Sequence, residues 1–411
     1  LTLDKLPFRG AVQVETFSAA GQPVYVADSA NTATAIATGA ITSIGRVGTD
    51  IADRDLPTIA ERAIKAGLRV GLVTTSSITD ATPASFLTHV SSRSCEGPEE
   101  ILGSSYYGVP QPTCPQDALQ NNGPGSIIEQ LAVSGAHVLF GGGEKFLGQI
   151  TARGESVRSL AERNGLRVLT EPGELENLRI DQAVMGLFDS ENLEVRWRGT
   201  DGRRAALTET SWLHHLSDYL GEAKEPELMA CEPNPEFETT PELAFMTHTA
   251  LRRLSTNNPQ GFFLMVESAS IDKQSHKRNP CGSIGEVAQL EEALALSLEF
   301  ARQHSNTLII VTADHAQSAQ ILPEPSHYSE YPIPIYSPGH TARLRTREGS
   351  VMRINYATNN GFSEEHTGAN VPLFANRTDQ KLLTPFLRQR DLHDVIAAFL
   401  FDEGASGPVK D

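Results

Sequence analysis

Short apolar runs alternate along the chain with segments of helical periodicity. Six runs are rich in β-branched and aromatic residues and have the length of strands; they cover residues 23–27, 68–75, 137–141, 261–268, 307–314 and 371–377. Several of these runs are apolar at almost every position, which is typical of strands buried on both faces, as in a mostly parallel sheet.

Helical patterns fall between these runs, most clearly over residues 283–304. Ser283 and Glu286 have the spacing of a capping box. The apolar residues that follow at three- and four-residue steps form one stripe: Ile284, Val287, Leu290, Leu294 and Leu298. Thr240, followed by Pro241, predicts the start of another helix with the threonine as its cap.

The alternation predicts an α/β fold, with a central, mostly parallel β-sheet flanked by helices on both faces. We expect one domain over residues 1–411. Segments 150–235 and 320–350 are rich in charged and turn residues, so we predict that they are peripheral insertions.

Charge and length narrow the class of protein. The 411 residues carry 51 acidic against 34 basic side chains, a net charge of −17, which argues against nucleic acid as a specific partner. Salt adaptation (a halophilic protein) and ordinary solubility both fit this acid excess, and we favour solubility. No apolar run approaches 18 residues, so we expect no membrane-spanning helix.

Four cysteines are present: Cys95, Cys114, Cys231 and Cys281. None lies in a C-x-x-C motif, which argues against a thiolate zinc site. Two disulfides are compatible with the even count, in any of three pairings, and pairing of sequence neighbours is the simplest. Two bridges would imply an oxidising compartment; four reduced, buried thiols are the alternative.

The stretch VADSANTATAIATG, residues 26–39, places Ser29 at a predicted strand-to-helix junction. A serine there is the N-cap of the helix or a nucleophile held at the helix N-terminus. The residues alone leave both interpretations open.

Side chains of the types that bind metal ions lie at or after the ends of two predicted strands and just before a third. They are Glu267, Asp272, His276, Asp314, His315 and His366. Functional groups of such sheets gather at the carboxyl ends of the strands, and acid–imidazole sets suit zinc, magnesium or manganese. Each residue alone also fits a solvated ion pair, a turn or a partnered core acid, and it is their joint pattern that favours a metal site.

A second group lies in residues 76–93 and comprises Asp80, Thr82 and Arg93. Asp80 by itself fits a helix start, and Arg93 by itself fits a solvated surface residue. If Arg93 faces Ser29, its planar guanidinium matches a phosphate group in bidentate fashion.

Five ordered motifs now carry a resemblance: VADSANTATAIATG, TDATPASFLTHVSSR, FFLMVESASIDKQSH, IIVTADHA and EEHTG. The chain resembles the bacterial alkaline phosphatase family from about residue 1 to 400, including SRSCEGP, NPCG and VLFGGGEKF. The resemblance implies a phosphate-monoester hydrolase in which Ser29 is the nucleophile and forms a phosphoserine intermediate.

The resemblance also implies two zinc ions and one magnesium ion. The implied ligands are Asp272, His276 and His366 for the first zinc, Asp314 and His315 for the second, and Glu267 and Thr82 for magnesium. It implies that Arg93 holds the phosphate with help from Asp28. The resemblance further implies that Asp80 lies next to the magnesium ligands without binding the ion, and that it contacts Lys273.

The partners implied by the resemblance are small phosphate monoesters and inorganic phosphate. A homodimer with two disulfides, in the periplasm or secreted, is also implied, and we expect neither nucleic acid nor membrane as a partner. Two alternatives remain: a related metallohydrolase of phosphodiesters or sulfate esters, and a catalytically weak phosphate- or metal-binding protein.

The chain departs from the family pattern at two places. The family has a Gly-Asp-Gly turn on its first strand, whose aspartate bridges the second zinc and magnesium, and no such turn precedes Ser29. We expect the complete polypeptide to include that strand upstream; a truly truncated form would bind metal weakly and have poor activity. Gln317 stands where some relatives carry histidine, which puts no proposed ligand in doubt.

Overall fold

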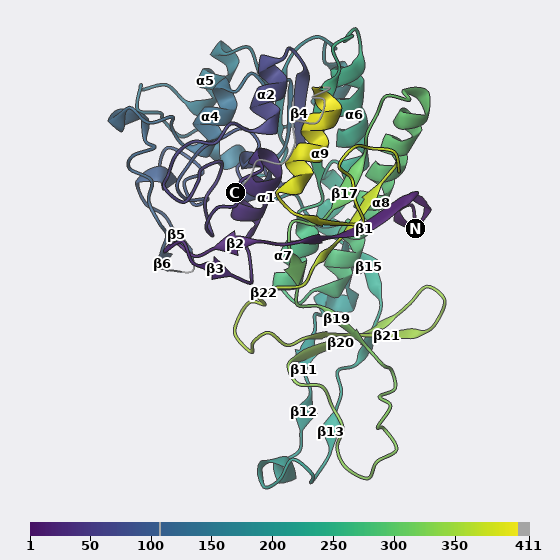
Figure 1. Ribbon diagram of the computed structural model, residues 1–411. Helices are drawn as coiled ribbons and strands as arrows, with labels where there is room; N and C mark the ends of the chain where they lie inside the picture. The colour runs from purple at the N-terminus through teal and green to yellow at the C-terminus, as the bar shows by residue number, and fades with distance from the viewer. Residues whose placement is uncertain (107, 402–411) are drawn as a thin grey trace.

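The centre of the protein is a parallel β-sheet. The computed structural model describes residues 1–106 and 108–401, so the end of the predicted domain at residue 411 lies outside the described part. Five strands, all parallel, form this sheet in the order β16 (Phe262–Glu267), β4 (Arg69–Ser77), β7 (Val138–Gly142), β9 (Val184–Leu187) and β8 (Arg167–Leu169). They lie in the upper part of the molecule (Figure 1).

Helices cover both faces of this sheet. Leu72 and Leu139 pack in one buried cluster with α2 (Ile59–Lys65), α4 (Ile127–Val133) and α5 (Val157–Arg163). The neighbouring Val73 and Phe140 pack in another, with α6 (Leu243–Ser255) and α8 (Pro280–Gln303). Successive side chains of a strand point to opposite faces, so the two clusters lie on opposite sides of the sheet. This arrangement confirms the predicted α/β fold with helices on both faces of a central sheet.

A second, mixed sheet carries four strands in the order β17 (Ile310–Thr312), β23 (Val371–Ala375), β1 (Phe8–Gln13) and β24 (Phe386–Arg388). The strand β23 is antiparallel to both β17 and β1. Among the described residues, β16 ends one large sheet and β17 ends the other, and both strands are half-buried. The expected upstream strand with a Gly-Asp-Gly turn stays a prediction.

A third sheet, of five short strands, forms a lobe below the other two (Figure 1). Its strands are β11 (Ala206–Leu207), β20 (His340–Arg345), β21 (Val351–Tyr356) and β19 (Gln320–Leu322), with β14 (Leu228–Met229) also paired to β20. Two-stranded pairs complete the strands: β2 (Thr16–Phe17) with β3 (Pro23–Val24), β5 (Ser105–Tyr106) with β6 (Val109–Pro110), β10 (Trp197–Gly199) with β15 (Cys231–Pro233), β12 (Glu209–Thr210) with β13 (Ala223–Lys224), and β18 (Ala316–Gln317) with β22 (His366–Thr367).

Four further helices lie around the two large sheets: α1 (Ser29–Thr38), α3 (Ala81–Ala84), α7 (Ser270–His276) and α9 (Asp391–Leu400). Short 3-10 helices occupy connections at Leu3–Lys5, Glu100–Leu102, Leu119–Asn121, Glu144–Phe146, Pro172–Asn177, Thr200–Gly202, Trp212–His215 and Pro235–Thr239. Within the described ranges, no helix combines the length and apolar character needed to cross a bilayer.

Two predicted helix starts are wrong. The helix predicted from Ser283 begins at Pro280, because the Asn279 side chain accepts from the Gly282 N–H and caps it. The helix predicted at Thr240 begins at Leu243, whose backbone N–H donates to the Gln289 side chain of α8. In both cases a partner that the local pattern does not identify satisfies the first turn.

Two predicted segments also differ from the structure. Residues 23–27 form no buried strand: β3 spans two residues, and Tyr25 is 87% exposed. Segment 150–235 is not wholly peripheral, because it supplies α5, β8 and β9 to the main layers, whereas segment 320–350 lies in the lower lobe. Charge in a segment marks its exposed faces and gives no measure of how its apolar positions pack.

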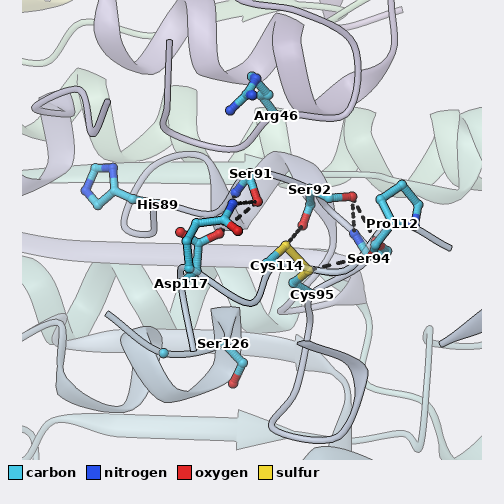
Figure 2. The surroundings of a disulfide bond; sticks show 12 residues. Arg46, His89, Ser91, Ser92, Ser94, Cys95, Pro112, Cys114, Asp117 and Ser126 are labelled. Atoms are coloured by element: carbon cyan, nitrogen blue, oxygen red, sulfur yellow. Dashed lines mark hydrogen bonds between the residues drawn. A yellow bond between two sulfur atoms is a disulfide. The ribbon is translucent and has the colours of Figure 1, made fainter. Parts of the chain in front are cut away.

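Two disulfides join Cys95 to Cys114 and Cys231 to Cys281, so the pairing of sequence neighbours is confirmed. Figure 2 shows the first bridge beside Ser92, Ser94 and Asp117. The second joins the start of β15, two residues after β14 of the lobe, to the first turn of α8.

Candidate active site

Ser29 is the first residue of α1, and Asp28 before it caps the helix. The Asp28 carboxylate accepts from the Asn31 backbone N–H at 3.3 Å, and the Asn31 side chain accepts from the Asp28 N–H at 2.9 Å. The alternative that Ser29 is the N-cap is therefore wrong. The Ser29 hydroxyl does not cap the helix and instead lies 2.9 Å from His315 Nε2.

Asp272, His276 and His366 form one set of converging donors. Asp272 and His276 lie one turn apart on α7, and His366 begins β22. His276 Nδ1 donates to the Glu364 carbonyl at 2.5 Å and His366 Nδ1 donates to the Ala27 carbonyl at 2.8 Å. With Nδ1 protonated, both Nε2 atoms have free lone pairs, and they lie 2.9 Å apart.

The Asp272 carboxylate faces these two rings. Its oxygens lie 3.3 Å from His276 Nε2 and 3.4 Å from His366 Nε2. Burial opposes ionisation of this carboxyl, yet its interactions with the neighbouring histidine rings hold its pKa well below the usual value. Asp272 therefore presents a carboxylate to the two rings at neutral pH.

Asp314 and His315 follow β17 and approach Ser29 from the second sheet. His315 Nε2 lies 3.3 Å from Asp314 Oδ2, and Thr32 on α1 donates to the same oxygen at 3.4 Å. His315 Nδ1 is buried and has no hydrogen-bond partner within the described residues. The second sheet thus presents a carboxylate and an imidazole to the hydroxyl at the start of α1.

The two donor sets meet. One donor atom each from Asp272, His315 and His366 lies within 4.8 Å of the others, and the His315 and His366 rings stack with centroids 3.6 Å apart. Imidazole nitrogens and a carboxylate at this separation fit zinc coordination. This grouping spans the two zinc sites that the sequence resemblance keeps apart, so the division into two sites stays a prediction.

Glu267 ends β16 at the same edge of the molecule. Thr74 donates to it at 2.5 Å, and Thr82 also hydrogen-bonds to it. Burial, together with the negative charges of Asp80 and Asp314, raises the pKa of Glu267 to about 7. A cation beside this carboxylate would favour its ionised form and lower the pKa again. Glu267 and Thr82 therefore suit a hard cation that prefers oxygen ligands.

Arg93 bridges the serine end of the site to the Asp80 carboxylate. It lies 3.4 Å from Asp28 and 2.6 Å from Asp80, which also pairs with Lys273. Burial favours the neutral form of Asp80, but the positive charges of Lys273 and Arg93 outweigh this effect and hold its pKa below the usual value. The Arg93 side chain is 34% exposed, so it can reach an incoming anion.

The loop that carries Arg93 is held in place on both sides. Asp117 accepts from the Ser91 backbone N–H and hydroxyl, each at 2.9 Å, and Cys95 is bridged to Cys114 (Figure 2). These contacts limit the freedom of the guanidinium before any ligand arrives.

Residues 1–371 match the family described as alkaline phosphatase. The chain belongs to the alkaline phosphatase family. It is 38% identical to alkaline phosphatase of Escherichia fergusonii over 97% of this chain and 79% of that one. It is 37% identical to alkaline phosphatase H of Pseudomonas aeruginosa, over 95% and 76% of the two chains. As a member of this family it is a phosphoric monoester hydrolase.

The fold agrees with solved structures of this family. Alkaline phosphatase from the Antarctic bacterium TAB5 superposes with a TM-score of 0.66 at 20% identity, covering 97% of this chain and 90% of that chain. A variant of the TAB5 enzyme has magnesium bound in its M3 site.

The structure of this alkaline phosphatase adds residues that sequence reasoning missed. Gln317, noted only as a departure, donates to Asp272 Oδ1 and lies opposite His366 in the β18–β22 pair. Thr74 donates to Glu267, and the half-buried Glu96 accepts from Thr79 at 3.0 Å. A polar residue near the end of an apolar strand is the only sequence signal for Thr74, and an acid beside a cysteine is the only one for Glu96.

Proposed function

We propose that this protein hydrolyses phosphate monoesters through a phosphoserine intermediate on Ser29, using two zinc ions and one magnesium ion. The observation that carries the proposal is the position of the Ser29 hydroxyl, at the N-terminus of α1 and 2.9 Å from His315 Nε2. A hydroxyl there meets both the helix N–H groups and a converging set of metal-type donors.

The proposed ligands are the members of the two donor sets, together with Glu267 and Thr82. Asp272, His276 and His366 would hold the first zinc, Asp314 and His315 the second, and Glu267 and Thr82 the magnesium. When bound, such ions supply charge neutralisation at the attacking and leaving oxygens and activate hydroxyl groups and water. Family membership and the donor types support this assignment.

The chain's own residues act at both halves of the reaction. Ser29 Oγ attacks the phosphorus atom, loses its proton and displaces the ester oxygen, which leaves in line as an alcohol. A water molecule then attacks the phosphoserine, releasing inorganic phosphate and restoring the Ser29 hydroxyl. Arg93 and the N–H groups at the start of α1 neutralise the phosphoryl oxygens in both steps.

Asp28, Asp80 and Lys273 act on the position of Arg93. Asp28 and Asp80 accept from the guanidinium on two sides, and Lys273 balances the charge of Asp80. We propose that this chain of ion pairs keeps the guanidinium aimed at the third anionic oxygen that monoesters have and diesters lack.

Comparison of an aryl phosphate monoester with an aryl phosphodiester and an aryl sulfate tests the substrate class. We expect the monoester to have the highest kcat/KM in metal-loaded protein, because only it offers the dianion that matches Arg93. A higher kcat/KM for the diester or the sulfate would replace the proposed substrate class with that alternative. Tight phosphate binding without turnover would instead support a binding protein.

Replacement of Arg93 by alanine is expected to lower kcat/KM for the monoester by about 10- to 100-fold, which corresponds to one lost charge-assisted contact. Inhibition by inorganic phosphate should weaken in parallel, and steady-state assays measure both. Arg54→Ala is the control, since Arg54 is an exposed arginine paired with Asp50. If phosphate inhibits Arg93→Ala as strongly as the wild type, Arg93 does not hold the phosphate.

We also propose that the protein acts in the periplasm or outside the cell, as a homodimer. The two disulfides support an oxidising compartment. The dimer is proposed from family membership alone.

A further inference from the structure

A buried ion pair lies directly behind the two histidines of the first proposed zinc site. Arg278, in the turn between α7 and α8, donates from Nε to Glu364 Oε1 at 2.6 Å. The side chains are 9% and 0% exposed. Since burying two charges costs more than burying apolar groups, a pair at this position calls for an explanation other than stability.

Hydrogen bonds on both sides satisfy the pair. Arg278 donates to the Gly361 and Asn359 carbonyls at 2.8 and 3.1 Å. The second oxygen of Glu364 accepts from the backbone N–H and the hydroxyl of Thr358. A buried polar network with every member paired has one geometry and resists displacement.

The network holds the backbone that carries the histidines. Glu364 N–H donates to the His276 carbonyl at 3.0 Å, and its own carbonyl accepts from His276 Nδ1 at 2.5 Å. Arg278 lies two residues after His276, and Glu364 two residues before His366. The pair therefore ties the segment that carries one histidine to the segment that carries the other.

The backbone of Arg278 points to the same role. Its φ of 56° lies in the left-handed region that residues other than glycine rarely adopt. Such conformations persist where surrounding contacts determine them, and they gather at functional sites. From this left-handed turn the guanidinium reaches Glu364 and the carbonyls of Gly361 and Asn359.

We propose that Arg278 and Glu364 are positioning residues for the first zinc site, setting the separation and ring orientation of His276 and His366. This inference rests on the proposed function, in which those two histidines bind the first zinc. Neither residue touches substrate. The hydrogen bond from His276 Nδ1 to the Glu364 carbonyl also fixes the tautomer that leaves Nε2 free for metal.

Zinc affinity of metal-free full-length protein tests the inference by competition with a chromophoric chelator. We expect Arg278→Leu and Glu364→Gln each to weaken the affinity for zinc at the first site by about 10- to 100-fold, as is typical when residues supporting a ligand are changed. Arg278→Lys should recover part of the loss and serves as a second variant where the leucine variant does not fold. Thermal unfolding of the metal-free proteins reports the purely structural effect.

Arg353→Ala is the matched control. Arg353 is a buried arginine of β21 that pairs with Glu225 and Glu324, away from the histidines in sequence. We expect this variant to lower thermal stability and to keep the zinc affinity of the wild type. If the Arg278 and Glu364 variants behave as Arg353→Ala does, the pair is structural only and the inference is overturned.

His276→Ala separates this inference from the proposed function. Loss of one bound zinc in that variant supports the assignment of the first site. If His276→Ala keeps the zinc content and affinity of the wild type, the site assignment itself fails. If His276→Ala loses zinc and the Arg278 and Glu364 variants do not, only the positioning role fails.

Discussion

Replacement of Ser29 by alanine is expected to lower kcat on an aryl phosphate monoester by about three orders of magnitude or more, because loss of a nucleophile removes the covalent route. The helix should remain, since Asp28 and not Ser29 caps α1. Steady-state kinetics measure the loss, and thermal unfolding checks the fold.

Ser156→Ala is the matched control for this variant. Ser156 is the N-cap of α5, where its side chain accepts from the Ser159 N–H. The control should lose about 1 kcal/mol of stability, as is typical for removal of a cap, and keep its activity. Ser29→Ala should show the reverse: stability near that of the wild type and almost no turnover.

The intermediate gives a second, independent readout. Acid quenching during turnover, followed by mass spectrometry of the peptide that contains Ser29, should detect phosphoserine in the wild type and none in Ser29→Ala. Near wild-type turnover in Ser29→Ala, or phosphate on another residue, would refute the nucleophile assignment.

Sequence reasoning picked out side chains that the structure brings close together, because several of them lie at strand ends. Glu267 ends β16 and Asp314 follows β17, and in α/β folds functional groups gather at the carboxyl ends of strands. Asp272 and His276, at a spacing of four, share one face of α7. These are local patterns with a direct geometric consequence.

Long-range partners were beyond that reasoning. Arg278 and Glu364 are 86 residues apart, and neither lies in a pattern that indicates the other. The start of α6 depends on a tertiary contact with Gln289 of α8, and the local capping pattern at Thr240 does not set where the helix begins. The exposed Tyr25 shows the same limit, because an apolar run does not reveal whether a sheet covers it.

Removal of metal ions by a chelator is expected to abolish activity, since Arg93 and the N–H groups of α1 contact the phosphoryl oxygens but neither activate the Ser29 hydroxyl nor stabilise the leaving oxygen. Zinc alone should restore most of the turnover, because both proposed zinc sites contain imidazole donors. Magnesium alone should restore none, since it prefers oxygen ligands. Activity after dialysis against each metal, and metal content by elemental analysis, measure these outcomes.

The response to magnesium should depend on pH through Glu267. With the pKa of this carboxyl raised to about 7 by burial and by neighbouring carboxylates, magnesium must displace a proton below that pH. In zinc-loaded protein, the apparent magnesium affinity should therefore fall by about tenfold per pH unit below pH 7 and level off above it. Glu267→Gln cannot lose a proton, so this variant should bind magnesium weakly and show no such slope.

Each result bears on a different part of the site. Full recovery with magnesium alone would contradict the assignment of zinc to the histidines. A magnesium affinity that is independent of pH in the wild type would remove Glu267 from the magnesium site and leave the zinc assignment intact. If magnesium affinity has the same pH slope in the wild type and in Glu267→Gln, another acid must titrate. Glu96 is then the residue to change next, because burial also raises its pKa to about 7.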